Sequence, residues 1–490
     1  MSKKEPLSRK LAFGIFYLLS GSSTSLILKV ITLGYIARTL EVEKFGLYSA
    51  IFSFVYLFQF ICNFGLNKAL LKLGSINSEK AQISFGNALF IKSILAIPTL
   101  ATITLLGLMA GYRSEELVIL EYFSIGLILD SYASVFGSIR RILGSFKLIS
   151  FLRVLQAAIN LLIIFIALSI NNSVLSLALA TMLLSFVIFI ISLSNTLFLL
   201  KPKLQLSLLS EFFKDSAIFS FSDFFSNVYA RIGVVLLSFF NNLHLVGIYS
   251  AAIRFTRIAN LLPAQIKFAL LPSLYRMFEE DSEQRQKRVF KIILKYMVIF
   301  ATPLAISIYF FSDTIIHIVF GKKYDLAIPL VQLFSIFIYL RFLETPFNLF
   351  YTAMHKHVQF VSFQGITSFL NVVLNIVLIP LYSVYGACAS TLISEASFAL
   401  MVIFNGEKHI WSTKDVFTAI LKPLVAGIIS LVIITTLLIK INVFIQILFL
   451  LLLYLVFLLI TKTFNKEDKE LLLKIFSTKK LEPILNEESE

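Results

Sequence analysis

The chain has 490 residues, of which 58% are hydrophobic and 14% are charged, and its formal net charge is +15. Soluble proteins carry about 25% charged residues, so the composition excludes an ordinary soluble protein. It also excludes a membrane β-barrel, which would show alternating segments of about ten residues instead of long apolar runs. We therefore expect an all-α polytopic membrane protein.

Fourteen apolar segments are long enough to span a membrane, which takes about 20 residues of helix. They centre on residues 11–37, 46–67, 84–110, 117–138, 150–170, 174–200, 216–239, 245–271, 290–319, 327–351, 358–380, 384–405, 418–439 and 443–461. Five of the segments contain a proline, which predicts local kinks at Pro98, Pro263, Pro303, Pro346 and Pro423.

Lysine and arginine are distributed very unevenly over the loops between these segments. With the N-terminus placed in the cytoplasm, 29 of them fall on the cytoplasmic side and 6 on the opposite side. This asymmetry follows the positive-inside rule and predicts that both termini are cytoplasmic in a multi-pass protein of the cytoplasmic (inner) membrane. The basic charge is then a topological signal, and we do not expect nucleic acid as a partner.

Two short phrases recur about two hundred residues apart. The sequence GLYSA at residues 46–50 is echoed by GIYSA at 247–251, and ALL at 69–71 is repeated at 269–271. Six spans separate the two copies, so the two halves enter the membrane in the same direction, as parallel repeats do. We expect two six-helix lobes around a central cavity, at residues 1–205 and 206–412, followed by two extra helices at 413–463 and a cytoplasmic tail at 464–490.

Eight basic residues fall within the predicted spans, where an unpaired charge costs at least about 2.5–3.5 kcal/mol at the bilayer centre. Lys92 and Lys422 lie near the ends of their spans, so we expect them to snorkel to the surface. The other six are candidate ligands of a cavity: Lys29, Arg231, Arg254, Arg257, Lys267 and Arg341. The deep acids, which are candidates for ion coupling or for pairing with these cations, are Asp130, Asp223, Glu344 and Glu395.

The spacing of the charges predicts how some of them are grouped. Asp223 and Arg231 are eight residues apart on one helical stripe, and Arg341 lies one turn from Glu344 and could pair with it. In a continuous eighth helix, residues 254, 257 and 267 share an arc of roughly 140°, which Pro263 could bend inward. The alternative interpretation is that these charges only pair with one another and hold the helices together. Because cations outnumber acids, an anion is favoured as the substrate, above all a phosphate.

No nucleotide-binding, metal-binding or catalytic motif is present, so we expect neither a cofactor nor a metal, and we expect a protein that is not an enzyme. A membrane polysaccharide polymerase or ligase would show a sizeable outward loop with catalytic groups, whereas every predicted outward loop is short.

Five motifs in order carry a resemblance to a known family. They are GYIARTL at residues 34–40 with FGLYS at 45–49, NFGLNKA at 63–69, VGIYSAA at 246–252 leading to LP at 271–272, FGKKY at 320–324, and NIVLIP at 375–380 with YGA at 385–387. Over residues 10–460 the chain resembles the oligosaccharide/polysaccharide flippases (Wzx-like) of the multidrug/oligosaccharidyl-lipid/polysaccharide (MOP) exporter superfamily.

The resemblance implies a flippase that moves an oligosaccharide on a polyprenyl phosphate or diphosphate to the outer leaflet by alternating access. Its implied partners are that anionic glycolipid, membrane lipid and other polysaccharide-assembly proteins. A peptidoglycan-precursor flippase and a drug exporter of the same superfamily are the alternatives. The chain departs from the family pattern at Gly233, where members often carry an acid two residues after the arginine, and at LEV in residues 40–42, where L-G-P is usual.

Overall fold

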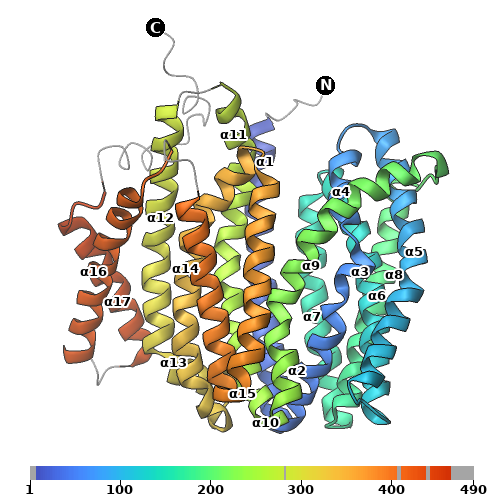
Figure 1. Cartoon of the computed structure of the whole chain (residues 1–490), viewed down its shortest axis with the longest axis horizontal. Coiled ribbons are helices and arrows are strands. Elements are labelled where there is room, and N and C mark those ends of the chain that lie inside the picture. The colour runs from blue at the N-terminus through green and yellow to red at the C-terminus, as the bar shows by residue number, and fades with distance from the viewer. Residues whose placement is uncertain (1–6, 281–282, 406–409, 438–441, 465–490) are drawn as a thin grey trace.

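The computed structural model describes residues 7–280, 283–405, 410–437 and 442–464, and these residues form helices and no strands (Figure 1). The α-helices of the part that precedes residue 205 are α1 (Leu7–Thr39), α2 (Val42–Leu57), α3 (Gln59–Asn63), α4 (Leu66–Gly74), α5 (Ser78–Met109), α6 (Glu115–Ile142), α7 (Phe146–Ile170) and α8 (Val174–Leu199). The later part contains η1 (Leu206–Leu208), α9 (Leu209–Phe240), α10 (Leu243–Ile253), η2 (Arg254–Asn260), α11 (Leu261–Glu280), α12 (Glu283–Phe310), α13 (Ser312–Val319), η3 (Lys322–Ala327), α14 (Ile328–Ala353), α15 (His357–Phe404), α16 (Thr413–Leu437) and α17 (Val443–Ile460).

These helices confirm the all-α architecture of fourteen spans. Eleven helical segments of the described chain are apolar and long enough to cross a membrane. The helix α1 adds one span, and the run α10–η2–α11 adds another. The long α15 supplies two, because its backbone leaves the helical conformation at Ser383, which has a φ of 53°.

The helices pack in two groups that follow the chain. In the first, α1 lies along α7, and α6 packs against α5 and α8; in the second, α14 packs between α12 and α15, and α9 lies along α15. The last two helices attach at the side of the second group, where α16 and α17 contact α12. Their anchor is Tyr454, whose hydroxyl donates to the carbonyl of Ile299 at 3.0 Å. The lobe boundaries predicted from the sequence remain our proposal, and the tail after residue 464 lies outside the described residues.

The two copies of the repeated phrase meet where α2 crosses α10, at the lower end of the molecule in Figure 1. A Cβ atom on Gly46 would lie 1.9 Å from the carbonyl oxygen of Leu243, and one on Gly247 would lie 2.3 Å from that of Val42. Residues 42 and 243 are separated by the same 201 positions as the two glycines, so each contact is the repeat image of the other. The contact confirms the parallel repeat and explains why both copies keep glycine.

The same end carries a second contact between the groups, between the end of α1 and the segment α13–η3. The Arg38 guanidinium donates to the carbonyls of His317 at 2.8 Å and Ile318 at 2.6 Å, which belong to the last turn of α13. In return, Lys323 donates to the carbonyls of Arg38, at 2.9 Å, and Leu40, at the end of α1. The free carbonyls that end each helix are thus satisfied by a cation of the other group. We call these contacts the reciprocal cap.

Two spans are broken midway. The second span bends between α3 and α4, where Phe64 and Gly65 have φ angles of 39° and 67°. A Cβ on Gly65 would also lie 2.2 Å from the carbonyl oxygen of Ser216 on α9. The position therefore requires glycine both for its positive φ and for this close approach. The eighth span changes to a 3-10 helix at η2, before Pro263, and not at the proline as we predicted. Pro263 lies in the first turn of α11, where its missing N–H leaves no helical hydrogen bond unmade.

Candidate functional site: a row of cations between the two groups of helices

The side chain of Arg231, on α9, lies against two aromatic rings of α2. Its guanidinium carbon is 5.6 Å from the ring centre of Phe52 and 5.1 Å from that of Tyr56. Its Nε atom is buried and has no hydrogen-bond partner among the described residues. A cation held over aromatic faces is attracted to them, but the rings accept few of its N–H groups, so the guanidinium can still donate to a ligand.

Tyr56 connects this cation to an acid of the first group. Its hydroxyl donates to Oδ2 of Asp130, on α6, at 2.9 Å. Asp130 therefore acts on Arg231 through the tyrosine ring, and is not its salt-bridge partner. Asp130 thus lies within its span, as predicted, but no carboxylate of the described residues is in contact with the Arg231 guanidinium.

The broken eighth span supplies two further arginines. Arg254 interacts with the hydroxyl of Tyr48 on α2, and Arg257 lies near enough to Arg254 and Arg231 to be repelled by both. The ammonium group of Lys29, on α1, is close enough to Arg153, on α7, and to Arg257 to be repelled by both. These residues form a continuous series that we call the cation row: Lys29, Arg153, Arg231, Arg254 and Arg257.

Among the described residues, the cation row is not paired with acidic side chains. No member has a carboxylate within salt-bridge distance in the part of the chain that the structure describes. Among the described residues, Arg153 has one side-chain hydrogen-bond partner, the hydroxyl of Ser22 on α1. Both groups of helices contribute, since two members come from α1 and α7 and three from α9 and η2. An excess of positive charge between helices is chemically suited to an anion with several oxygens.

Arg341 was predicted to join this site, but the structure gives it a different environment. It contacts Oε1 of Glu344, on its own helix α14, at 2.8 Å, so the predicted pair forms. It also contacts both oxygens of Glu395, on α15, at 2.7 and 2.9 Å. Glu395 accepts in addition from the Tyr229 hydroxyl at 2.6 Å. The charge of Arg341 is therefore more than compensated, which is the opposite of the cation row.

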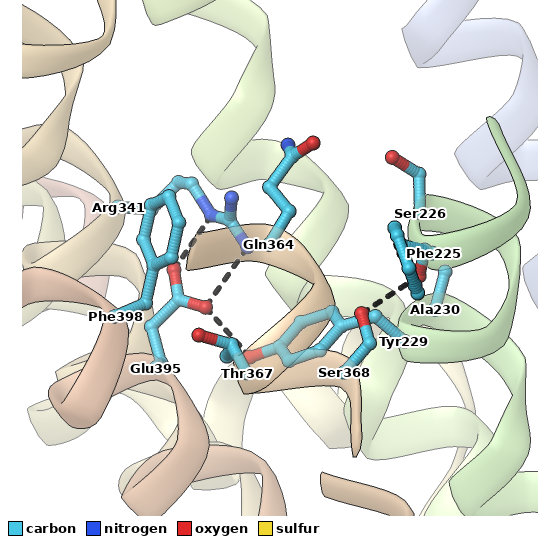
Figure 2. A pocket seen from close by; sticks show the side chains of 10 residues that line it. All are labelled: Phe225, Ser226, Tyr229, Ala230, Arg341, Gln364, Thr367, Ser368, Glu395 and Phe398. Carbon is cyan, nitrogen blue, oxygen red and sulfur yellow. Dashed lines mark hydrogen bonds and ion pairs between the residues drawn. The ribbon is translucent and has the colours of Figure 1, made fainter. Parts of the chain in front are cut away.

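A cavity of about 210 Å³ opens beside this cluster. Figure 2 shows Glu395 between Arg341 and Tyr229, with polar side chains around the space. The lining residues are Phe225, Ser226, Tyr229, Ala230, Arg341, Gln364, Thr367, Ser368, Glu395 and Phe398.

Lys267 and Asp223 are also placed apart from the cation row. Lys267 donates to Oδ1 of Asn348 at 2.8 Å, and its arc with the arginines is lost because η2 is not an α-helix. Asp223 pairs at 2.6 Å with Lys68, on α4, so it joins the two groups of helices instead of facing Arg231.

Two basic residues were misjudged from the sequence. Lys92 does not snorkel: it is fully buried, and its ammonium donates to Oδ1 of Asn63 at 2.9 Å and to Ser131. Arg153 was counted from the sequence among the 29 cytoplasmic lysines and arginines, in the segment that follows the fourth span, yet it lies two turns inside α7, which begins at Phe146. The helix-breaking Gly144, with a φ of 67°, marks this start and could have placed Arg153 within the helix.

Comparison with known protein families decides the assignment. The model of the family described as "polysaccharide biosynthesis protein" matches residues 11–278, more than half of the chain. The chain belongs to this family. All five members of the cation row lie within the matched residues.

Two curated relatives are archaeal. An uncharacterized membrane protein of Methanocaldococcus jannaschii is 26% identical over 173 residues, 35% of this chain and 33% of the relative. A probable low-salt glycan biosynthesis flippase, Agl15 of Haloferax volcanii, is 24% identical over 183 residues, 37% of this chain and 38% of the relative. The matches thus span 33% and 38% of the length of these relatives.

Solved structures share the fold over a larger part of the chain. A lipid II flippase, MurJ, in an inward closed conformation has a TM-score of 0.75 and 17% identity, covering 90% of this chain and 97% of the other. An inward-facing multidrug resistance transporter of the MOP superfamily has a TM-score of 0.63 and 14% identity, covering 79% and 94%. The matched family and the shared fold both agree with the resemblance drawn from the sequence.

Proposed function

We propose that this protein is a flippase that carries a polyprenyl-(di)phosphate-linked oligosaccharide from the cytoplasmic to the outer leaflet, for the assembly of a cell-surface polysaccharide or glycan. The observation that carries the proposal is the uncompensated cation row between the two groups of helices. The name of the Haloferax relative, a probable glycan biosynthesis flippase, supports the same class of substrate.

The chemistry of the row favours a phosphate-bearing head group. Guanidinium groups present several N–H donors in one plane, which matches the oxygens of a phosphate or diphosphate. Each charge left unpaired within a membrane costs at least about 2.5–3.5 kcal/mol, and a bound dianion offsets that cost for several residues together. The cationic substrate of a drug exporter would instead be repelled by the row.

The position of the row suits transport by alternating access. The two groups of helices touch at one end through the glycine crossing and the reciprocal cap, and the row has members from both groups. A head group held by both can therefore respond to, and bias, a rocking motion of one group against the other. We propose that the end with the cap faces outward and that both termini are cytoplasmic in the cell membrane, in keeping with the distribution of lysine and arginine.

The decisive experiment measures the movement of a labelled lipid-linked oligosaccharide across liposomes that contain the purified protein. We expect the double variant Arg254→Gln with Arg257→Gln to lose translocation, because two charge-assisted hydrogen bonds of about 1.5–3 kcal/mol each correspond to a fall in affinity of at least about 100-fold. The matched control is Lys422→Gln, since Lys422 is an exposed basic residue of α16, which packs on α12 and α17.

Normal translocation by the double variant, at equal amounts of folded protein, would overturn the role of the cation row. A second set of liposomes that contains a lipid-linked peptidoglycan precursor tests the head group. Preference for that substrate over the oligosaccharide would replace the proposed cargo while keeping the phosphate site.

A further inference from the structure

Two carboxyl groups share one guanidinium inside the second group of helices. The side chains of Glu344 and Glu395 are 4% and 1% exposed, and they lie within hydrogen-bond reach of each other. Arg341 contacts both, at 2.8 Å and 2.7 Å. Two carboxylates this close repel each other strongly in a buried site, and one proton shared between them removes the repulsion.

The charges around the pair leave one negative charge unmatched. The charged and titratable groups that act on it are Arg341 from α14 and Tyr229 from α9, and no further lysine, arginine or histidine of the described helices contacts either acid. With both acids ionised, the cluster would carry a net charge of −1 within the membrane. One bound proton makes it neutral.

The hydrogen bonds indicate which acid carries the proton. Glu395 accepts from Arg341 and from Tyr229, so it is arranged as the ionised partner. One buried oxygen on each acid, Oε2 of Glu344 and Oε1 of Glu395, has no hydrogen-bond partner among the described residues. A protonated Oε2 is a donor rather than an acceptor, and the neighbouring carboxylate can accept from it.

The cavity beside the cluster gives the proton a path. It is lined by Glu395 and Arg341, and Ser226, Gln364 and Thr367 supply further polar groups (Figure 2). A volume of about 210 Å³ has room for several water molecules, since each takes about 30 Å³ in the liquid. Water in a polar cavity can pass a proton to or from a carboxyl group at its wall.

We propose that Glu344 and Glu395 form a proton-binding carboxyl pair that holds one proton between them beside Arg341 and exchanges it with water in the adjoining cavity. On release, the O–H bond of Glu344 breaks as the proton passes to Glu395, which lies at the cavity wall. The proton then leaves Glu395 on cavity water, and both carboxylates remain with Arg341. The site binds a proton and not a metal cation, because the Arg341 guanidinium already contacts both acids and would repel a second cation. If the protein is the flippase proposed above, this pair provides a site for ion coupling in a chain that has Gly233 where family members often carry an acid.

Infrared spectroscopy of the purified protein tests the pair without any transport. We expect a carbonyl band of a protonated buried carboxyl group at neutral pH, which is lost in Glu344→Gln and also in Glu395→Gln, because the remaining acid ionises beside Arg341. Glu121→Gln is the matched control: Glu121 is a half-buried acid of α6, bound to Thr104 at 2.6 Å, and its loss should leave the band in place.

The wild-type protein also provides a test that does not depend on how the variants fold. The band should disappear when the pH is raised and should not change with sodium concentration. A missing band, a band that survives both substitutions, or a band that sodium removes would each overturn the proton site.

A transport arm separates this proposal from the proposed function. In liposomes with a pH gradient, we expect Glu344→Gln to lose any stimulation of translocation by the gradient. Failure of wild-type translocation with the infrared band intact would reject the proposed flippase and keep the proton site. Translocation that responds to the gradient equally in wild type and Glu344→Gln would reject the proton site and keep the flippase.

Discussion

At the scale of single residues, the arginines of this protein differ more in their surroundings than in their charge. Arg231 rests on Phe52 and Tyr56 with an unsatisfied Nε, whereas Arg341 is enclosed by carboxylates. The first arrangement leaves N–H groups for a ligand, and the second uses them within the protein. An arginine inside a membrane protein is therefore a candidate ligand only after its own partners are known.

The substitution Arg231→Lys tests this distinction. Lysine keeps the charge but cannot stack flat on two rings or offer a planar set of donors, and these differences are worth about 0.5–2 kcal/mol. We expect the affinity for the lipid-linked oligosaccharide to fall by about tenfold, and further in Arg231→Gln, as measured by binding to the purified protein. Arg113→Lys, at an exposed position, is the control; equal affinities of Arg231→Lys and wild type would contradict the role of the guanidinium.

At the scale of helices, the reciprocal cap joins two sequence motifs that lie almost three hundred residues apart. GYIARTL ends α1, and FGKKY forms the turn into η3, and each supplies the cation for the carbonyl end of the other group's helix. The ring of Tyr324 meets Phe45 edge-on at 5.8 Å beneath these contacts. The motifs thus hold one end of the two groups together, a role that neither motif indicates alone.

Removing either cation of the cap should make this end easier to open. Because Arg38 and Lys323 are exposed, we expect a modest effect of about threefold to tenfold in Arg38→Ala or Lys323→Ala, near the lower limit for charged hydrogen bonds. The measurement is the labelling rate of a cysteine introduced at the buried Ala37 by a maleimide that cannot cross the membrane. Lys322→Ala is the matched control, and equal rates in all three variants would show that the cap does not hold the end closed.

At the scale of the whole molecule, the duplication fixes how the two groups meet. Gly46 and Gly247 bring the backbones of α2 and α10 so close that neither position has room for a methyl group. The contact is made twice by the same residues of the repeat. Equivalent substitutions in the two halves should therefore have equivalent consequences.

Gly46→Ala and Gly247→Ala should each destabilise the protein by at least about 1–3 kcal/mol, because the helices must separate to admit the methyl group. Thermal unfolding of the purified protein measures this effect. In Gly137→Ala, the nearest atom to the added methyl group is 4.0 Å away, at the end of Arg140, so this variant should be no less stable than wild type. If Gly46→Ala and Gly247→Ala were as stable as Gly137→Ala, the close contact at the crossing would be contradicted.

The sequence alone predicted the fourteen spans, the parallel repeat and the pairing of Arg341 with Glu344, since these depend on hydropathy, on the 201-residue offset and on spacing within one helix. It could not predict that Glu395 joins that pair, because α14 and α15 meet only in the folded chain. It also misplaced Lys267 relative to the arginines, since the arc assumed a continuous helix where η2 interrupts it. Lys92 was misjudged because its partners, Asn63 and Ser131, come from other helices that meet it only in the folded chain.

The symmetric crossing of α2 and α10 has a mechanical consequence. It lies at one end of the molecule, so it can serve as a hinge about which the two groups of helices rotate. With a hydrocarbon core about 30 Å thick, a turn of about 10° at this point would separate the far ends by about 5 Å. The cation row has members from both groups, so the same turn changes the spacing of its charges. For the phosphate-bearing cargo proposed above, we therefore expect the affinity of the row to change with the angle between the two halves.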